Sequence, residues 1–426
     1  MMMLGKPSCD RDTPLALSAA LQQFVETLYG DLLLTLAMGL KLLFYKIFSS
    51  SVLLMASLLG ATAAADGLPK SLTWSAYNLG TTGYNQSVAI GKMLREHYGT
   101  TLRVIPGKND ISRLLPLVKG RVQFSANGIA TYFAQEGVQQ FAATNWGPLP
   151  LRIVLTSNGD SNQAIGVAAD TGIKTLGELR GKRVPYVRGA PAINETIRAL
   201  LACADLTWAD VERVEFPGYS AMWNGVINGQ IDAAYATTVS GPARKLEASP
   251  RGIHWPPVPH KDAGCWQRMA KVVPFFSQHH ATRGAGISPE QPHEGATYPY
   301  PILVTLADTD SEMVFELTRA LHLHYDDYKE ADPGSIGWAL DRQLFNWVVP
   351  FHDGAVQYLR KAGVWTDALD AHNNALIARQ DVLQQAWQNY QAGPGKTAQN
   401  KAAFSAGWLA ARIEALEQQG MDPIWR

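Results

Sequence analysis

The feature of this sequence that most constrains its fold is a repeated alternation of short apolar segments with amphipathic segments of helical period. In the first round we expect, in order, a strand at 72–76, a helix at 86–97, a strand at 101–105, a helix at 110–119 and a strand at 122–125. Such an alternation builds a parallel sheet with covering helices. The second helix contains Pro116, which weakens it, and Asp110 or Ser112 is its expected N-cap.

A further strand is expected at 152–157, after which the alternation restarts and predicts a second unit of similar size. The expected elements of this second unit are an apolar segment at 165–168, a short helix at 175–179, a strand at 183–187, a helix at 192–203, a strand at 211–216, a helix at 219–228 and a strand at 231–236. Asp232, which begins the last of these strands, is expected to cap or to form a pair rather than to do chemistry.

The C-terminal part of the chain departs from this order. Segment 250–301 is rich in Pro, Gly and His, and it is too long for a structureless loop, so we expect it to pack across the body or to carry short strands. After it we expect a strand at 302–306, a helix at 311–329 and a mostly helical remainder from about residue 351.

Two β/α units, with late segments that return to the first, predict an α/β protein of two lobes. We expect lobe 1 over residues 66–158, lobe 2 over 159–299, and a return to lobe 1 with a helical C-terminal extension over 300–426. Ligands of such sheets bind in the crevice at the carboxyl ends of the strands. The cleft between the lobes is therefore the expected binding site.

Residues 1–65 have the layout of a secretory signal. A short basic region is followed by an apolar segment at 47–59 and then by small residues. Because signals begin near the initiator Met, we expect Met38 to be the true start, with cleavage near Ala65 and release into the periplasm. The alternative is that segment 47–59 stays uncleaved as an anchor.

Composition and motifs exclude several functions. Lys+Arg and Asp+Glu both total 37, so the net charge is zero and no basic field would attract nucleic acid. No nucleophile–base motif, phosphate-binding glycine motif or paired acids at a telling spacing is present. His279 and His280 form a lone pair in a loop-like segment, and we expect no metal site and no cofactor. The chain is predicted not to be an enzyme.

Two of the three cysteines, Cys203 and Cys265, follow the expected signal. An exported protein experiences conditions that favour disulfides, so the two thiols could pair. Cys203 also lies on the apolar face of an expected helix, where a small buried thiol is equally reasonable. The sequence leaves both readings open.

Several segments together resemble the TAXI family of TRAP-transporter solute receptors, over about residues 70–365. The segments that carry the resemblance are 80–85 (GTTGYN), 177–184 (GELRGKRV), 228–233 (NGQIDA), 301–305 (PILVT) and 352–358 (HDGAVQY). The resemblance implies a Venus flytrap fold of the periplasmic binding proteins, type II-like, without catalysis. It also implies a small organic acid or amino-acid-like ligand and, as partner, the membrane permease subunits of an ion-driven TRAP-type transporter.

The loops that would touch ligand depart from the family. The glycine-rich run expected after the first strand is here 77–83, YNLGTTG, and the turn after the strand at 183–187 is RGAPAINE, residues 188–195. The family's ligands therefore do not transfer safely to this chain.

Candidate ligand contacts lie where strands run into helices, because free N–H groups at helix N-termini attract carboxylates and small residues permit close approach. Gly, Asn and Thr are also ordinary turn residues. The candidates are Asn78, Thr81, Thr82, Gly83, Asn85, Lys108, Asn127, Gly128, Arg188, Ala190, Asn194, Tyr219, Trp223, Thr237 and Thr238.

Among these candidates, Arg188 is expected to grip a ligand carboxylate, because it ends a strand just before a helix. Tyr219 and Trp223 would form aromatic walls, although Trp223 at helical spacing also suits a core position. Thr237 would offer a hydroxyl. Lys108 suits a ligand contact or a solvated surface equally.

Three other functions remain as alternatives to a TRAP-type receptor. The same fold serves as the binding subunit of an ATP-driven importer. An exported enzyme on this scaffold would need a nucleophile and base that the motifs do not provide. A membrane-bound sensor would need the apolar segment 47–59 to stay uncleaved.

Overall fold

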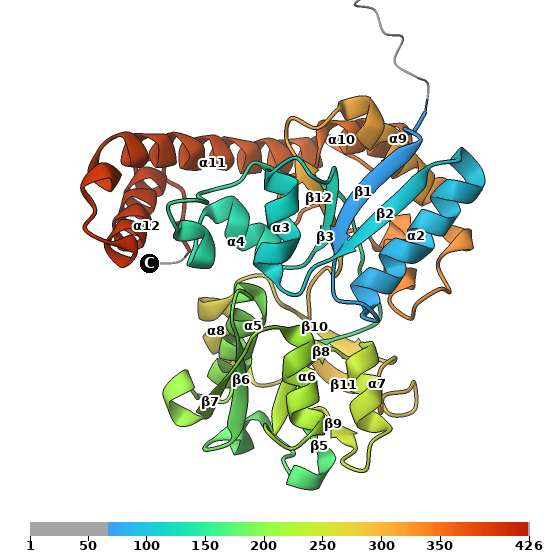
Figure 1. Ribbon diagram of the computed structural model, residues 1–426, viewed down its shortest axis with the longest axis vertical. Helices are drawn as coiled ribbons and strands as arrows, with labels where there is room; N and C mark the ends of the chain where they lie inside the picture. The colour runs from blue at the N-terminus through green and yellow to red at the C-terminus, as the bar shows by residue number, and fades with distance from the viewer. Residues whose placement is uncertain (1–66, 425–426) are drawn as a thin grey trace, which may run out of the picture. The chain divides into compact units, whose positions relative to one another are not determined.

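Two lobes, each built around β-strands, organise residues 67–424, the part of the chain that the computed structural model describes (Figure 1). The predicted signal over residues 1–65, the start at Met38 and the cleavage near Ala65 lie outside the described residues. Within the described part, no helix combines the length and apolar character needed to cross a membrane.

The first half of the described chain alternates strands and helices as the sequence predicts. Its strands are β1 (Ser71–Ala76), β2 (Thr101–Pro106), β3 (Phe124–Asn127), β4 (Leu151–Thr156), β5 (Gln163–Ala168), β6 (Arg183–Val187), β7 (Glu212–Phe216) and β8 (Ala233–Thr237). Its helices are α2 (Thr82–Tyr98), α3 (Asp110–Val118), α4 (Ala130–Glu136), α5 (Pro191–Cys203), α6 (Tyr219–Ile227) and α7 (Gly241–Glu247).

The second half is mainly helical. Its strands are β9 (Ile253–His254), β10 (Ser277–Ala281), β11 (His293–Thr297) and β12 (Ile302–Leu306). Its helices are α8 (Ala263–Val272), α9 (Ser311–Leu323), α10 (Asp353–Lys361), α11 (Asp367–Ala392) and α12 (Lys401–Gln418). Segment 250–301 thus carries short strands, as predicted, and also a helix.

Lobe 1 is built on a five-stranded sheet of order β2-β1-β3-β12-β4. β1 runs parallel to β2 and β3, which confirms the predicted parallel unit. β12 lies between β3 and β4 and is antiparallel to both. A strand from late in the chain therefore completes the centre of this sheet, and apolar residues such as Trp74, Phe124 and Phe133 are buried against it.

Two details of lobe 1 differ from the prediction. α3 is capped by Asn109, whose side chain accepts from Ser112 N at 2.9 Å, rather than by Asp110 or Ser112. The helix expected at 311–329 ends at Leu323 and is followed by a separate 3₁₀ turn, Tyr325–Asp327. α3 continues through Pro116.

Lobe 2 contains three smaller groups of strands: β8-β5-β9, the parallel pair β6-β7 and the hairpin β10-β11. Asp232 precedes β8 and pairs with the guanidinium of Arg183 at the start of β6, which confirms its predicted pairing role. The Asp232 backbone N–H also donates to Arg183 O at 3.0 Å, so β6 and β8 are joined there.

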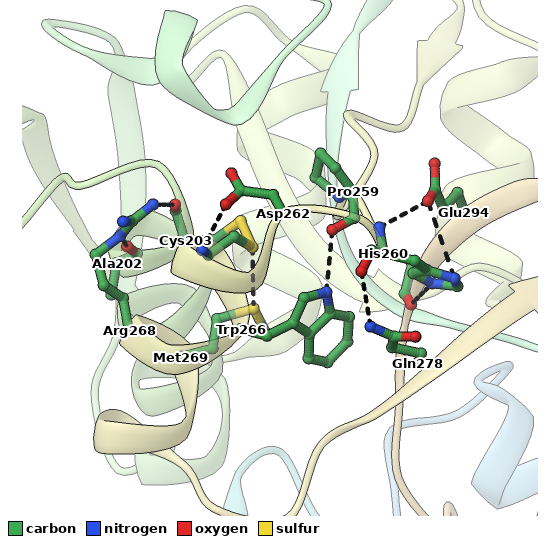
Figure 2. Close-up of a disulfide and its surroundings, with 12 residues drawn as sticks. Ala202, Cys203, Pro259, His260, Asp262, Trp266, Arg268, Met269, Gln278 and Glu294 are labelled. Atoms are coloured by element: carbon green, nitrogen blue, oxygen red, sulfur yellow. Dashed lines mark hydrogen bonds and ion pairs between the residues drawn. A yellow bond between two sulfur atoms is a disulfide. The ribbon is translucent and has the colours of Figure 1, made fainter.

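A disulfide between Cys203 and Cys265 joins the end of α5 to the start of α8, and Figure 2 shows it with its neighbours. Asp262 caps α8 by accepting from Cys265 N at 3.0 Å. Arg268, one turn further along α8, donates to the carbonyl of Ala202 at 2.8 Å. Of the two readings that the sequence left open, the structure adopts the bridge.

The helical C-terminal extension, α11 and α12, forms a hairpin that packs on α4 of lobe 1 (Figure 1). Glu136, at the end of α4, is fully buried and pairs with Arg379 of α11 at 2.8 Å and with Arg412 of α12. Burial alone would raise the pKa of the Glu136 carboxyl, but the two guanidinium groups outweigh it and hold that pKa below its usual range. Charge pairing thus fixes the hairpin to lobe 1.

Two crossover segments connect the lobes. Residues 157–162 run from β4 to β5, and residues 298–301 return from β11 to β12. They lie side by side, since Ser157 N donates to Pro301 O at 2.8 Å and Tyr300 N donates to Ser157 O at 2.6 Å. These two short connecting segments lie where hinges occur in two-lobed proteins, namely in a few loop or element-terminal residues.

Candidate functional site

A cavity lies where the two lobes meet the crossovers. Lobe 1 contributes the loops after β1, β2 and β3, and lobe 2 contributes the starts of α5 and α6 and the end of β8. The lining residues are Tyr77, Asn78, Thr81, Lys108, Asn109, Asp110, Arg113, Gly128, Ala192, Ile193, Tyr219, Tyr235, Ala236, Thr237, Tyr298 and Tyr300. The cavity therefore occupies the carboxyl ends of strands, where α/β sheets bind ligands.

Tyrosines dominate the lining. Tyr77 and Tyr300 pack with ring centroids 5.0 Å apart, and the hydroxyls of Tyr235 and Tyr298 lie 2.9 Å apart. Burial raises the pKa of Tyr219 to about 12 and raises the pKa of the other four phenols as well. These hydroxyls stay protonated at neutral pH and can donate to a ligand, while the ring faces suit an apolar or planar body.

Gly128 leaves room beside the Tyr77–Tyr300 pair. A methyl group on Gly128 would lie 3.1 Å from the Tyr77 hydroxyl oxygen and 3.3 Å from the Tyr300 ring, closer than ordinary van der Waals contact. Gly83 supports the other side, since a methyl group there would lie 2.3 Å from the Tyr77 ring. Small residues on both sides therefore permit this placement of the Tyr77 ring.

Asp110 and Arg113 form a buried ion pair in the cavity wall. Arg113 Nε donates to Asn127 Oδ1 at 3.1 Å, and the guanidinium lies 4.0 Å above the Tyr77 ring. Burial raises the pKa of Asp110, and the charge of Arg113 works against that rise. Arg113 is thereby held in one orientation, with Nη1 making no hydrogen bond within the described residues.

Asp110 also joins the two lobes. Its Oδ2 accepts from the backbone N–H of Ala192, at the start of α5, at 2.8 Å. A second link runs from Asn109 Nδ2 to the carbonyl of Arg188 at 3.3 Å. The N-terminus of α5, where a ligand carboxylate could bind, is therefore already matched by a carboxylate from lobe 1.

The model of the NMT1-like family matches residues 78–363, a span that covers both lobes and stops before α11. The chain belongs to the NMT1-like family. No curated protein matches it.

The solved structures that this chain matches include periplasmic and amino-acid-binding proteins. The alkanesulfonate-binding protein SsuA from Xanthomonas axonopodis pv. citri, bound to MOPS, is 15% identical over 72% of this chain and 84% of its own, with a TM-score of 0.40. An ancestral arginine-binding protein bound to arginine is 14% identical over 62% and 97%, with a TM-score of 0.37. The aliphatic sulphonate-binding protein SsuA from Escherichia coli is 14% identical over 69% and 85%, with a TM-score of 0.37. The predicted two-lobed α/β architecture is confirmed by the strand order of this chain and by the two crossovers between its lobes.

In this NMT1-like protein, six of the predicted site residues line the cavity. These six residues come from both lobes. The six are Asn78, Thr81, Lys108, Gly128, Tyr219 and Thr237. Lys108 is exposed and has no ion-pair partner within the described residues.

Four other predicted residues support the wall without lining it. Asn127 holds Arg113, as described above. Asn194 fixes the turn before α5, accepting from Val187 N at 2.8 Å and donating to Val187 O at 2.9 Å. Trp223 is buried and donates to the carbonyl of Tyr235 at 3.1 Å. Thr238 accepts from Asn162 N in the first crossover at 3.1 Å.

The remaining predicted residues lie away from the lining. Arg188 is exposed on the turn after β6. Ala190 is buried in that turn, and Thr82 is buried in the first turn of α2. Asn85, one turn further along α2, donates to Asp332 at 3.3 Å. Gly83, in the same helix, contacts the back of the Tyr77 ring.

Sequence reasoning missed most of the tyrosines and the buried ion pair. Tyr298 and Tyr300 stand in the segment Tyr-Pro-Tyr-Pro just before the return strand, so their position at a crossover was a usable signal. Asp110 and Arg113 are three apart on one helix, a spacing that places both side chains on one face. Tyr235 belongs to a predicted strand, and only the lobe arrangement directs it to the cavity.

Proposed function

We propose that this chain is an exported solute-binding receptor. In this role it captures a small organic ligand that carries a carboxylate, and it passes the ligand to a TRAP-type membrane permease. The observation that carries the proposal is the cavity itself, which both lobes and one crossover line together. A ligand in such a cavity contacts both lobes at once, so its binding energy favours the closed arrangement.

The lining favours an organic acid or an amino-acid-like molecule. Arg113 Nη1 and the ammonium of Lys108 are the cationic groups available to a carboxylate. The five tyrosine rings would cover the apolar part of the ligand. Their hydroxyls, together with Asn78, Thr81 and Thr237, would form hydrogen bonds with its polar groups. Asp110 is committed to Arg113 and to Ala192 N, so the role proposed for it is alignment rather than catalysis.

Delivery to a TRAP-type permease rests on the TAXI resemblance, and delivery to an ATP-driven importer is the rival. Reconstitution distinguishes them, because an ion-driven permease requires a cation gradient and no ATP. Proteoliposomes that contain the permease encoded by a gene neighbouring that of this chain should take up the ligand in proportion to the cation gradient. This uptake should persist without ATP. Uptake only with ATP would contradict the TRAP assignment and retain the receptor role.

The binding role is tested by a thermal-shift screen of the purified protein against organic acids and amino acids. A ligand that binds the folded state raises the apparent melting temperature. Small-angle scattering with the best ligand should then give a smaller radius of gyration than without it. If no acid raises the melting temperature, or if Tyr300→Ala binds the best ligand like wild type, the proposed cavity is not the binding site.

A further inference from the structure

Three ligand-type side chains converge on one point of lobe 2, away from the cavity. His260 lies in the loop before α8, His280 on β10 and Glu294 on β11, and one ligand atom from each lies within 4.8 Å of the other two. His280 and Glu294 are direct partners in the β10–β11 ladder, so the hairpin itself places them side by side. We propose that these three residues bind a divalent transition-metal ion, with Zn²⁺ as the best match.

The hydrogen bonds around His260 prepare it as a ligand. Its Nε2 lies 2.8 Å from the carbonyl oxygen of Gly295. A carbonyl only accepts, so this nitrogen carries the proton and Nδ1 keeps its lone pair. Metal-binding histidines are oriented in this way, with the second ring nitrogen donating to a carbonyl or a carboxylate. The free Nδ1 lies 3.9 Å from Glu294 Oε1 (Figure 2).

The distances suit a tetrahedral ion. With Zn–N and Zn–O bonds of about 2.0–2.1 Å, two ligand atoms lie about 3.4 Å apart. His260 Nδ1 and Glu294 Oε1 are about half an ångström beyond this spacing, and the three ligand atoms lie within 4.8 Å of one another. Because Glu294 is partly exposed and His280 is exposed, rotation of these two side chains would bring the three atoms onto one ion. The rings of His260 and His280 meet at 70° with centroids 4.5 Å apart, so their in-plane lone pairs can aim at a common point. His280 is exposed, and water can provide the fourth ligand.

A rival group in lobe 1, formed by His97, His324 and Asp327, satisfies the same distance criterion. Its two imidazoles are stacked nearly parallel, with centroids 3.7 Å apart and planes 23° apart. Lone pairs in stacked planes do not converge on one point. His97 Nε2 also lies 2.9 Å from Asp327 Oδ2, a hydrogen-bond distance. This group therefore serves as the matched control.

The prediction that His279 and His280 form a lone pair in a loop-like segment was wrong, and the alternation of side chains along a strand explains why. His279 and His280 lie on β10, not in a loop, and adjacent strand residues face opposite sides. His279 points toward Asn162 of the first crossover, with Nδ1 and Oδ1 2.8 Å apart. His280 faces Glu294 instead. The bound ion would tie the loop before α8 to the hairpin, next to the disulfide that ties α8 to α5.

Calorimetric titration of the purified full chain with ZnCl₂ tests the proposal. All samples carry Cys9→Ser, which removes the thiol outside the disulfide. We expect one Zn²⁺ per chain, and Co²⁺ in its place should show the visible absorption of tetrahedral coordination. His260→Ala and His280→Ala should each weaken binding by at least the roughly 100-fold that loss of a partner outside the ligand shell can cost, and Glu294→Gln by at least about tenfold. His97→Ala should leave binding unchanged.

Either of two results would overturn the proposal: equal zinc affinity in His280→Ala and wild type, or loss of binding in His97→Ala alone. Circular dichroism checks each variant for folding. His280 is exposed, so its variant decides the question if His260→Ala does not fold. Glu294 accepts from His260 N at 2.6 Å, and the amide introduced by Glu294→Gln keeps an oxygen that can accept this bond. A weaker affinity in that variant therefore reports the lost charge.

Discussion

The two lobes are secured by different chemistry. In lobe 1, the C-terminal helices α11 and α12 are held by the buried carboxylate of Glu136, which pairs with the guanidinium groups of Arg379 and Arg412. Lobe 2 holds α5 to α8 through a covalent bond between Cys203 and Cys265. A buried ion network is sensitive to charge and pH, whereas a disulfide is sensitive to reductant. Each lobe can therefore be weakened by a treatment that spares the other.

The largest expected effect comes from removing the charge of lobe 1. Glu136→Gln leaves Arg379 and Arg412 buried without their counter-charge, and breaking such a network costs about 3–5 kcal/mol. Urea unfolding should show this loss in wild-type and variant protein compared at neutral pH. Dithiothreitol should not change the difference between the two. A loss below about 1 kcal/mol would mean that the network does not hold the hairpin.

The disulfide of lobe 2 should rank second. The bond closes a loop of 62 residues, and bridges of this kind typically contribute about 2–4 kcal/mol. The double variant Cys203→Ala, Cys265→Ala should lose this amount, and dithiothreitol should destabilise wild type by the same amount without affecting the variant further. Equal stability of wild type with and without reductant would contradict a stabilising bridge.

The lobes also differ in the arginine that each offers to a ligand. Arg113 of lobe 1 lines the cavity, and Arg188 of lobe 2 is exposed outside the lining. Arg113→Lys keeps the charge but loses the planar fork, so affinity for the best acidic ligand should fall about tenfold, or about 1.4 kcal/mol. Arg188→Ala should bind like wild type. Calorimetry that finds the reverse order would return the carboxylate site to Arg188.

Acid should weaken the surroundings of His293 in lobe 2 before it weakens the Glu136 network of lobe 1, which is the smallest effect predicted. Burial lowers the pKa of His293 to about 4, from an ordinary value of 6.5. The stability from neutral His293 is complete above pH 6.5, is lost progressively as the pH falls from 6.5 to about 4, and is gone below about 4. Glu136, with a lowered pKa, contributes above its ordinary value of 4.5 and loses its contribution only below it.

The variant His293→Gln tests whether His293 causes the loss of stability in acid, because glutamine does not titrate. Between pH 7 and pH 5, wild type should lose about 1–2 kcal/mol more unfolding free energy than this variant. Urea unfolding at the two pH values measures the difference. Parallel losses in both proteins would show that His293 is not the acid-sensitive group.

Local periodicity predicted most elements of the fold. The strand at 302–306 and the helix at 192–203 match the structure within one residue. Periodicity reports which face is buried, but it does not report strand partners, so the antiparallel insertion of β12 beside β3 could not be foreseen. The six predicted residues that line the cavity follow strands. Tyr235 could not be foreseen, because only the arrangement of the lobes directs this strand residue to the cavity, whereas Tyr298 and Tyr300 carried a usable signal in their position at a crossover.

The central position of β12 has a consequence for the order in which the chain can fold. Residues 163–297 are synthesised as one uninterrupted stretch and contain every strand of lobe 2. The sheet of lobe 1 stays incomplete until β12 has emerged, and α11 and α12 follow later still. Contacts between distant parts of a chain form slowly, because the intervening segment must first be closed into a loop. The edges of β3 and β4 that β12 will occupy therefore stay open until β12 is available, whereas lobe 2 can form from its own continuous stretch.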